Sequence, residues 1–383
     1  MRYINWAGYV CIPLAFLFHY WIGNEGSGKH KPWEPTVTFL LAAFGVIPLA
    51  HLMGEATEHL SERTGPTWGG LLNATFGNAA ELIIAIIAMT KGLNEIVKAS
   101  LTGSILGNLL LVAGAAMVVG GWGREKQDFS RANAESSSGL LLVGVAAMLF
   151  PAIFHHSFHL VDPKLVEHEH RVSVGTSIIL LVVYAAGLLF TLRTHAHIFS
   201  HPPAQTPEDP PGLGDEAHWS VKKSIGLLVA AAVGVGVVAE LLVGSAETVA
   251  QKLGWNHVFV GVILLAIIGN AAEHSTALLL AKRNDMDTAM TITYQSSLQI
   301  ALFVTPFLVL LSTAFVAGGV GHATHLDLLF TPMEVVAVLL AVLTTAFLGL
   351  NGETNWFEGV LLLALYAVLG IVFFYIPSVA GVH

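Results

Sequence analysis

Two glutamates, Glu81 and Glu273, lie in long apolar stretches, and each ends the same five-residue string, GNAAE. An ionisable side chain inside a bilayer costs about 3 kcal/mol even on the lenient insertion scale, so such a residue is a functional candidate. Asn78 and Asn270 precede the glutamates by three residues, which on an unbroken helix puts amide and carboxylate on one face. The glycine of each string allows close helix packing, or a local unwinding that frees backbone carbonyls as ligands.

Neutral oxygens are found in the neighbouring apolar stretches of each half. Ser104 and Ser296 are separated by 192 residues, as are the two GNAAE strings. Two carboxylates among neutral oxygens suit a hard divalent cation, because calcium takes six to eight oxygen ligands. We therefore predict a cation and proton site at Glu81 and Glu273, with the two asparagines as neutral ligands. The candidates for lining the pathway are Thr75, Ser104, Asn108, Ser296, Ser297 and Gln299.

A second group of ionisable residues is a candidate for a gate or a proton route. It consists of Glu55, Glu58, Glu247 and His274. The string ATE at 56–58 matches SAE at 245–247 with an offset of 189, whereas the offset of 192 pairs Glu55 with Glu247, and both registers stay open. Each acid can also be a structural residue that is hydrogen-bonded in its protonated form. His274 follows Glu273 directly, so on a helix it points about 100° away from that carboxylate.

Other metal chemistry has little support in the sequence. The single cysteine, Cys11, excludes a disulfide framework and a cysteine-rich zinc site. The apolar stretches contain no pair of histidines at metal-ligand spacing and no HExxH motif. We therefore expect no cofactor.

Composition places the chain in the membrane. Of 383 residues, 54% are hydrophobic and 11% are charged, against about 25% charged in ordinary soluble chains. Mean hydropathy is +0.70, and apolar runs of about 20 residues match roughly 30 Å of hydrocarbon. The net charge of −9 provides no basic face for nucleic acid. We predict an all-α, multi-pass membrane protein in contact with the lipid bilayer, with a homo-oligomer left open.

About eleven transmembrane helices are expected, because continuous apolar runs favour helices over the alternating strands of a barrel. The fifth run is short and ends near Pro151, so a count that differs by one stays open. The runs cover residues 4–22, 37–58, 67–90, 96–120, 139–155, 172–191, 221–243, 257–281, 288–313, 331–350 and 357–376.

The widest polar break divides the chain into two related halves. The second to sixth runs carry the first GNAAE string and the seventh to eleventh carry the second. Since five is odd, the second copy enters the membrane from the opposite side, as in the inverted repeats of many transporters. Loops on the N-terminal side hold more Lys and Arg, which favours a cytoplasmic N terminus. The predicted divisions are a first helix and loop at 1–36, repeat 1 at 37–191, a cytoplasmic, proline-rich and weakly acidic linker at 192–220, and repeat 2 at 221–383.

Histidines gather in two predicted loops, where such clusters can bind transition metals or respond to pH near 6.5. We interpret them as parts of solvated loops without a function of their own. They are His155, His156, His159, His168 and His170 in one loop, and His195, His197, His201 and His218 in the other.

The paired segments GNAAELIIAIIA and GSILGNLLLV, then GNAAEHSTALLLA and QSSLQIALFV, resemble the two signature repeats of the calcium/cation antiporter superfamily. The resemblance is closest to its Ca²⁺/H⁺ exchanger branch and extends from about residue 40 to 376. It implies that Glu81 and Glu273 are shared ligands for cation and proton, and that Asn78 and Asn270 flank them. It also implies that four of the pathway candidates, Ser104, Asn108, Ser296 and Gln299, help to line the pathway.

The chain departs from the family pattern in two places. The segment between the repeats is proline-rich, with four carboxylates between Glu208 and Glu216, where family members carry an acidic helix. This composition does not favour a regulatory calcium site there. Gln295 stands where a small residue is usual.

The function that the sequence predicts is a proton-driven calcium exporter in the plasma (inner) membrane of a prokaryote, working by alternating access. Two carboxylates in one desolvated site cannot easily both ionise, so one holds a proton until calcium binds. The alternatives are a sodium-coupled exchanger, an exchanger or channel for another cation, and an intramembrane metalloenzyme, which the missing metal-ligand motif disfavours.

Overall fold

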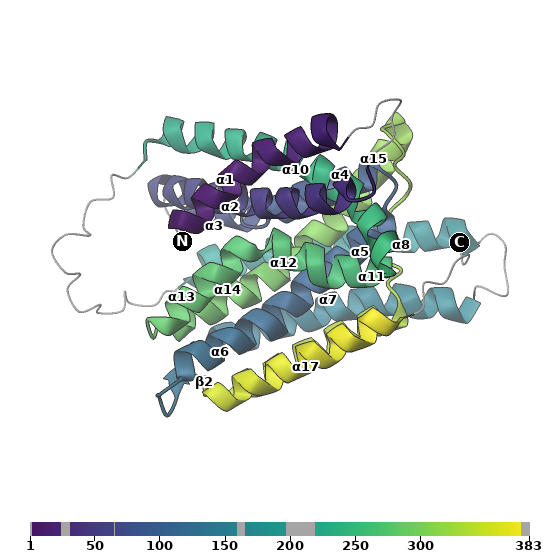
Figure 1. The fold of residues 1–383 in the computed structure, drawn as a ribbon. Helices are drawn as coiled ribbons and strands as arrows, with labels where there is room; N and C mark the ends of the chain where they lie inside the picture. Colours follow the sequence, from purple (N-terminus) through teal and green to yellow (C-terminus); the bar gives the residue numbers. More distant parts are fainter. Residues whose placement is uncertain (1, 24–30, 65, 159–164, 197–218, 377–383) are drawn as a thin grey trace.

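The computed structural model describes the chain apart from residues 1, 24–30, 65, 159–164, 197–218 and 377–383 (Figure 1). The described part is almost entirely helical, which confirms the all-α class, and its two short strands pair antiparallel. Within it, eight helices are long and apolar enough to cross a membrane, and one bent pair adds a ninth. Two shorter apolar helices, Ala7–Ile22 and Ala79–Thr90, fall in the first and third predicted spans. The count of eleven therefore stays a prediction.

The bounds of the elements are as follows. The helices are α1 (Arg2–Leu17), α2 (Glu34–Thr64), α3 (Pro66–Phe76), α4 (Ala79–Thr90), α5 (Asn94–Leu106), α6 (Ala113–Gly121), α7 (Arg131–Phe158), α8 (Leu165–Leu189), α10 (Val221–Leu253), α11 (His257–Phe259), α12 (Ala266–Gly269), α13 (Ala271–Lys282), α14 (Met286–Gln299), α15 (Thr305–Gly318), α16 (Pro332–Leu348) and α17 (Trp356–Tyr375). The strands are β1 (Gln127–Asp128) and β2 (Glu353–Thr354). Wider π-helical turns join α5 to α6, α11 to α12 and α14 to α15.

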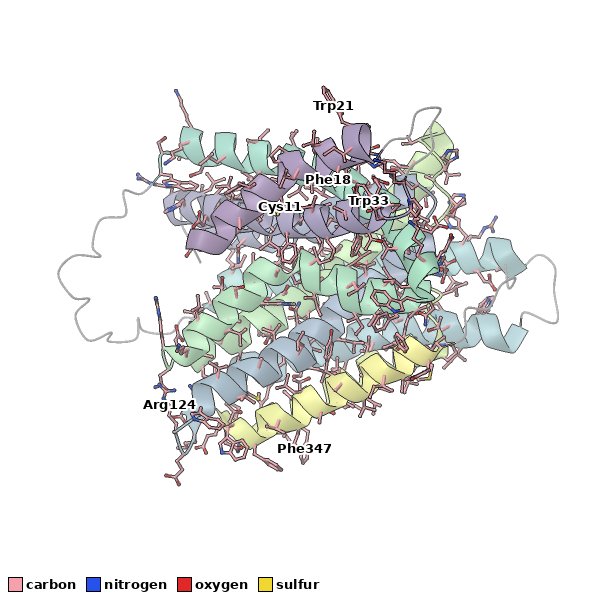
Figure 2. All side chains as sticks on the ribbon, in the orientation of Figure 1. Cys11, Phe18, Trp21, Trp33, Arg124 and Phe347 are labelled. Carbon is pink, nitrogen blue, oxygen red and sulfur yellow. The ribbon has the colours of Figure 1, made fainter. Side chains whose placement is uncertain are left out.

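The outer surface of the bundle is apolar, as lipid contact requires. Trp21 and Phe347 are 81% and 73% exposed, and both point away from the bundle (Figure 2). Exposed aromatic side chains of this size are unfavourable in water and favourable against lipid tails. The protein is thus a multi-pass integral membrane protein.

One layer of the bundle consists of α1, α2 and α10, which lie along one side of the remaining helices (Figure 1). In this layer α2 packs against both α1 and α10. Glycine permits the close approach of α1 and α2, because a side chain on Gly8 would come within 2.8 Å of Pro48 and of the Phe44 carbonyl. A polar cavity lies between α2 of this layer and the helices α12, α13 and α14.

The third and eighth predicted spans are broken. The first helix of the third span ends at Phe76 and the next begins at Ala79, while the eighth span bends by 62° between Gly269 and Ala271. The predicted spans over 67–90 and 257–281 are therefore each interrupted at their GNAAE string. This is the local unwinding that the glycine of each string allowed.

The fifth predicted span also needs correction. We expected a short helix over 139–155, but α7 runs from Arg131 to Phe158 and includes Pro151. The polar start of this helix, RANAESSS, lowered the hydropathy of the first turns and concealed them. Its Asn133 and Ser137 are nevertheless buried, because they face α14 rather than lipid.

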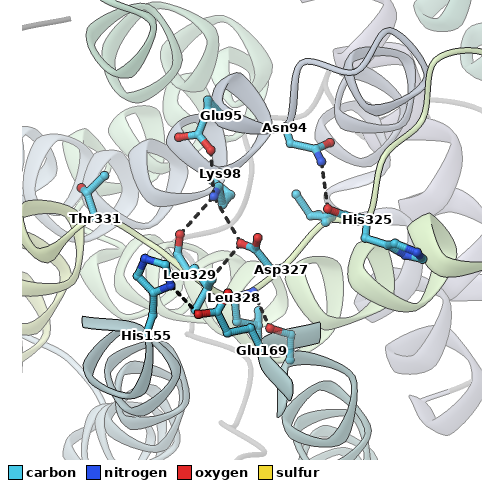
Figure 3. Close-up of polar contacts among 12 residues, drawn as sticks. Asn94, Glu95, Lys98, His155, Glu169, His325, Asp327, Leu328, Leu329 and Thr331 are labelled. Atoms are coloured by element: carbon cyan, nitrogen blue, oxygen red, sulfur yellow. Dashed lines mark hydrogen bonds and ion pairs between the residues drawn. The ribbon is translucent and has the colours of Figure 1, made fainter. Parts of the chain in front are cut away.

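The loops collect at two ends of the bundle. At the first, which we call the strand end, β1 pairs with β2, and Gln127 donates to Asn284 Oδ1. At the opposite end, which we call the Lys98 end, Lys98 contacts Asp327 and the Leu329 carbonyl (Figure 3).

Candidate cation site

Both GNAAE strings place their polar residues at the N-terminus of a half-helix. Asn78 and Asn270 immediately precede α4 and α13, and Glu81 and Glu273 lie in the first turns. The unpaired N–H groups and the positive dipole end of a first turn favour negative charge. Because α4 runs toward the Lys98 end and α13 toward the strand end, the two positive ends meet inside the bundle.

Hydrogen bonds link the two strings through α14. Ser296 Oγ lies 2.5 Å from Glu273 Oε2 and 2.8 Å from Asn78 Oδ1. Asn78 Nδ2 donates to Gln299 Oε1 at 2.6 Å. A serine of the second repeat thus touches the asparagine of the first string and the glutamate of the second.

The related contact on the other side of the site is made by Asn270. Its Nδ2 donates to Ser104 Oγ and to the Ala266 carbonyl, both at 2.9 Å. The Oδ1 atom is buried and has no hydrogen-bond partner among the described residues. A buried amide oxygen without a partner is costly, and it is a free ligand for a cation.

This difference predicts unequal effects of removing the two amides. We expect Asn270→Ala to raise the apparent calcium Km by up to about tenfold, because it removes a free oxygen ligand. Asn78→Ala should have a smaller effect, since Ser296 already occupies its Oδ1. Calcium-dependent initial rates in vesicles measure both, with Asn351→Ala in a strand-end turn as the control. An unchanged Km for Asn270→Ala would contradict a ligand role.

A cavity of about 680 Å³ lies between α2, α3, α4, α12, α13 and α14. Glu81 and Glu273 both line it, and it extends past Leu280 and Thr288 toward the strand end. The Glu81 side chain packs against Gly269 there, because a Cβ on Gly269 would lie 3.3 Å from Glu81 Cγ. The remaining lining includes Glu55 and Glu58 of α2, and no residue of α10 lines it.

The structure separates the other sequence candidates into two groups. Glu55, Glu58, Ser296 and Gln299 line the cavity together with the two principal glutamates. The second group does not line it and consists of Thr75, Asn78, Ser104, Asn108, Asn270, Ser297, Glu247 and His274.

Members of the second group are held in other ways. Thr75 is exposed and donates to the Leu71 carbonyl, whereas Ser297 is buried and donates to the Thr293 carbonyl. Glu247 accepts a bond from Gln251 within its own helix. Buried polar atoms of Asn108 and His274 have no hydrogen-bond partner among the described residues.

The cavity is also lined by residues that we did not predict from the sequence, namely His51, Asn73, Thr276 and Thr288. Gln295 lines it too, although the sequence marked that residue only as a departure from the family pattern. Two of them had a usable signal. Asn73 precedes Gly77 by four residues and Thr276 follows Glu273 by three, so each lies one helical turn from the motif. His51 and Thr288 come from other segments, and only packing brings them to the cavity.

The histidine loops are more ordered than we expected. His155 Nδ1 lies 2.6 Å from Glu169 Oε1, and the Glu169 side chain is buried (Figure 3). The His170 ring contacts the ring of His325. The interpretation of a freely solvated loop is therefore wrong for His155 and His170, while 159, 197, 201, 218 and most of the 192–220 linker lie outside the described residues.

Known proteins provide an independent comparison. The chain is 41% identical over 386 residues to a Ca²⁺/H⁺ antiporter of Synechocystis sp., with 96% of each chain covered. It is 43% identical over 349 residues to the Ca²⁺/H⁺ antiporter ChaA of Bacillus subtilis, covering 91% of this chain and 94% of that one. The solved structure of native YfkE superposes with a TM-score of 0.77 at 37% identity, covering 98% of this chain and 99% of that one.

The sequence profile of one family matches in two segments, residues 34–193 and 223–375. Together the two segments cover most of the chain, and each contains one GNAAE string. The chain belongs to the sodium/calcium exchanger protein family.

Proposed function

We propose that this protein is a Ca²⁺/H⁺ antiporter that exports calcium from the cytosol in exchange for protons. The observation that carries the proposal is the meeting of Glu81 and Glu273, from two inverted half-helices, in one cavity. Similarity over nearly the whole chain to two proteins named Ca²⁺/H⁺ antiporter supports it. The protein is accordingly a transporter rather than an enzyme.

The donor set favours a hard cation as the cargo. The described residues contain no group of three or more His, Cys, Asp and Glu side chains arranged to hold a metal ion. A cation at Glu81 and Glu273 therefore has to complete its shell with neutral oxygens, such as Asn270 Oδ1, backbone carbonyls and water. Calcium accepts such oxygen-rich, flexible shells, whereas zinc and copper favour nitrogen and sulfur ligands.

The hydrogen bonds around Ser296 indicate where the exchanged proton resides. A serine hydroxyl has one hydrogen, yet Ser296 Oγ contacts two acceptor atoms, Glu273 Oε2 and Asn78 Oδ1, at bonding distance. Both contacts are satisfied if the Glu273 carboxyl is protonated and donates to Ser296, which in turn donates to Asn78. The cation-free site thus has room for one proton in its hydrogen-bond network.

Calcium and protons then compete for the same oxygens. Binding of Ca²⁺ supplies the positive charge that allows both carboxylates to ionise, so protons leave as calcium enters. Reloading with protons on the other side neutralises the pair and releases calcium. This shared use couples the two fluxes without a second site.

Exchange between the two sides follows from the repeats, which we propose to be 37–191 and 221–383, joined by a cytoplasmic 192–220 linker. The two matched family segments support this division. Each repeat adopts one of two related conformations, and exchange of these conformations moves the opening from one end to the other.

The orientation that we propose places the strand end in the cytoplasm of a prokaryotic cell, with the N terminus on that side. In a Cys11→Ser background, Asp209→Cys and Asn351→Cys should then react with an impermeant maleimide from the cytoplasm, and Asp327→Cys from outside. Labelling of right-side-out and inverted vesicles measures this. The reverse pattern would invert the orientation, and a mixed pattern would refute the inverted plan.

Transport itself is tested in inverted vesicles with an imposed pH gradient and no sodium. Calcium uptake that collapses with the gradient is expected. Uptake that requires sodium would favour a sodium-coupled exchanger, and uptake of another divalent ion in preference to calcium would reassign the cargo.

A further inference from the structure

The half-helices α4 and α13 end on basic residues at the same place in the two repeats. Lys91 and Arg283 are separated by 192 residues, and each closes its helix through its backbone N–H. The next residues, Gly92 and Asn284, both have left-handed backbones with φ of 75° and 69°. The repeat relation is thus preserved through the helix end and the turn that follows.

Lys91 joins its half-helix to α10 at the Lys98 end. Its Nζ donates to the Glu240 carbonyl at 3.3 Å. The same atom lies 3.3 Å from the position that a Cβ on Gly244 would occupy. Because the cavity does not reach α10, this contact lies on the closed side of the protein.

Arg283 occupies the equivalent position at the open side. It is exposed at the end of α13, beside the cavity that α13 lines together with α2. The offset of 189 that aligns ATE with SAE places Glu55 over Gly244 and His51 over Glu240. In this conformation Glu55 Oε1 lies 3.3 Å from His51 Nε2, within its own helix.

Both basic residues are presented by turns that are fixed to the opposite repeat. At the Lys98 end the His322 N–H donates to the Thr90 carbonyl, and Asn94 donates to Thr324 and His325 (Figure 3). At the strand end the Ser130 N–H donates to Asp287 Oδ1. A change of conformation therefore has to alter the distance from these turns to α2 and α10.

We propose that Lys91 and Arg283 are alternating latches of the transport cycle. In the present conformation Lys91 holds α10 against α4 and closes the Lys98 end. In the opposite conformation Arg283 holds α2 against α13, with the Glu55 carboxylate as its partner, and closes the strand end. The inference rests on the alternating access of the proposed function, and it names the residues that set the balance between the two conformations.

The test uses two repeat-related cysteine reporters in a Cys11→Ser background. Leu280→Cys reports the open strand end, because Leu280 lines the cavity. Ala88→Cys reports opening of the Lys98 end, because Ala88 is only 2% exposed in this conformation. The ratio of the Ala88→Cys to the Leu280→Cys maleimide rate is proportional to the ratio of the two conformations, whichever of them dominates. Denatured samples give the total reactive thiol.

We expect Lys91→Met to raise this ratio and Arg283→Met to lower it, each by about 1.5- to 5-fold, as for a partly exposed polar contact. Arg283→Lys should stay near the parent value, and the double Met variant should return toward it. Glu55→Gln should lower the ratio and add nothing to Arg283→Met, because the two changes remove one contact.

Shifts of equal sign for Lys91→Met and Arg283→Met, or no shift in either, would overturn the latches. The labelling ratio needs no calcium gradient, so it fails or succeeds independently of the transported ion. Absence of proton-driven calcium uptake in wild-type vesicles would instead refute the proposed function while leaving the labelling result interpretable.

Discussion

Glu81→Gln and Glu273→Gln are each expected to reduce proton-driven calcium uptake to background. The amide has nearly the same shape as the carboxyl but carries no negative charge and does not exchange a proton at neutral pH. Each substitution therefore removes both a cation ligand and a proton carrier from a cavity that holds two principal glutamates. Initial rates of uptake into inverted vesicles with an imposed pH gradient measure the effect.

The loss should not come from unfolding. A glutamine at 273 can still bond Ser296, and a glutamine at 81 fits the space beside Gly269. Expression and thermal unfolding in detergent should therefore stay near wild type. Glu135→Gln is the matched control, because Glu135 is exposed and its ion-pair partner among the described residues is Arg131, one turn away on α7. Substantial uptake by either cavity variant would refute the assignment of the site.

Lowering the pH on the calcium-loading side is expected to raise the apparent calcium Km with little change in Vmax. Protonated Glu81 and Glu273 are unavailable to calcium, so acid removes binding sites from the pool. The direction follows from linkage: calcium binds the form with fewer protons, so its affinity falls as pH falls and levels off once both carboxyls are ionised.

The size of the pH effect reports the number of protons released. Apparent affinity should fall by about a hundredfold per pH unit if two protons leave for each calcium bound, and about tenfold if one leaves. Because the two acids are coupled, we expect a slope between these limits near neutral pH. Acid on the opposite side should accelerate uptake, because it reloads the site with protons.

A loading-side Km independent of pH, with an effect on Vmax alone, would mean that protons act elsewhere. His274 would then be the first residue to examine, since it is buried next to Glu273 and its Nε2 has no hydrogen-bond partner among the described residues. Comparison of His274→Gln with wild type at two pH values would decide this. The shared-carboxylate mechanism requires that this variant keep the pH dependence of Km.

Much of this protein could be predicted from local features of the chain. The length of the apolar runs is set by bilayer thickness, so the all-α, multi-pass class followed from hydropathy. Glu81 and Glu273 stood out because a carboxylate in an apolar run is costly and the same five residues recur around both. The offset of five runs, an odd number, from one GNAAE string to the other predicted the inverted arrangement of half-helices that the structure displays.

Only the tertiary structure decided how these parts meet. The breaks at Asn78 and Asn270 depend on contacts with α5 and α14, which supply hydrogen bonds that an isolated segment lacks. Of the remaining acids, Glu55 and Glu58 line the cavity and Glu247 does not, although sequence relates them.

Related residues of the two repeats occupy different places because a chain with two related repeats adopts one asymmetric conformation at a time. A motif sets which groups are available, because residue type and spacing are local properties. In the mechanism that we propose, the side of the membrane that is open depends on how α2 and α10 pack against the half-helices that face them. That packing joins segments more than 140 residues apart, as in the contact of Lys91 with Glu240, and no pattern within either segment determines it.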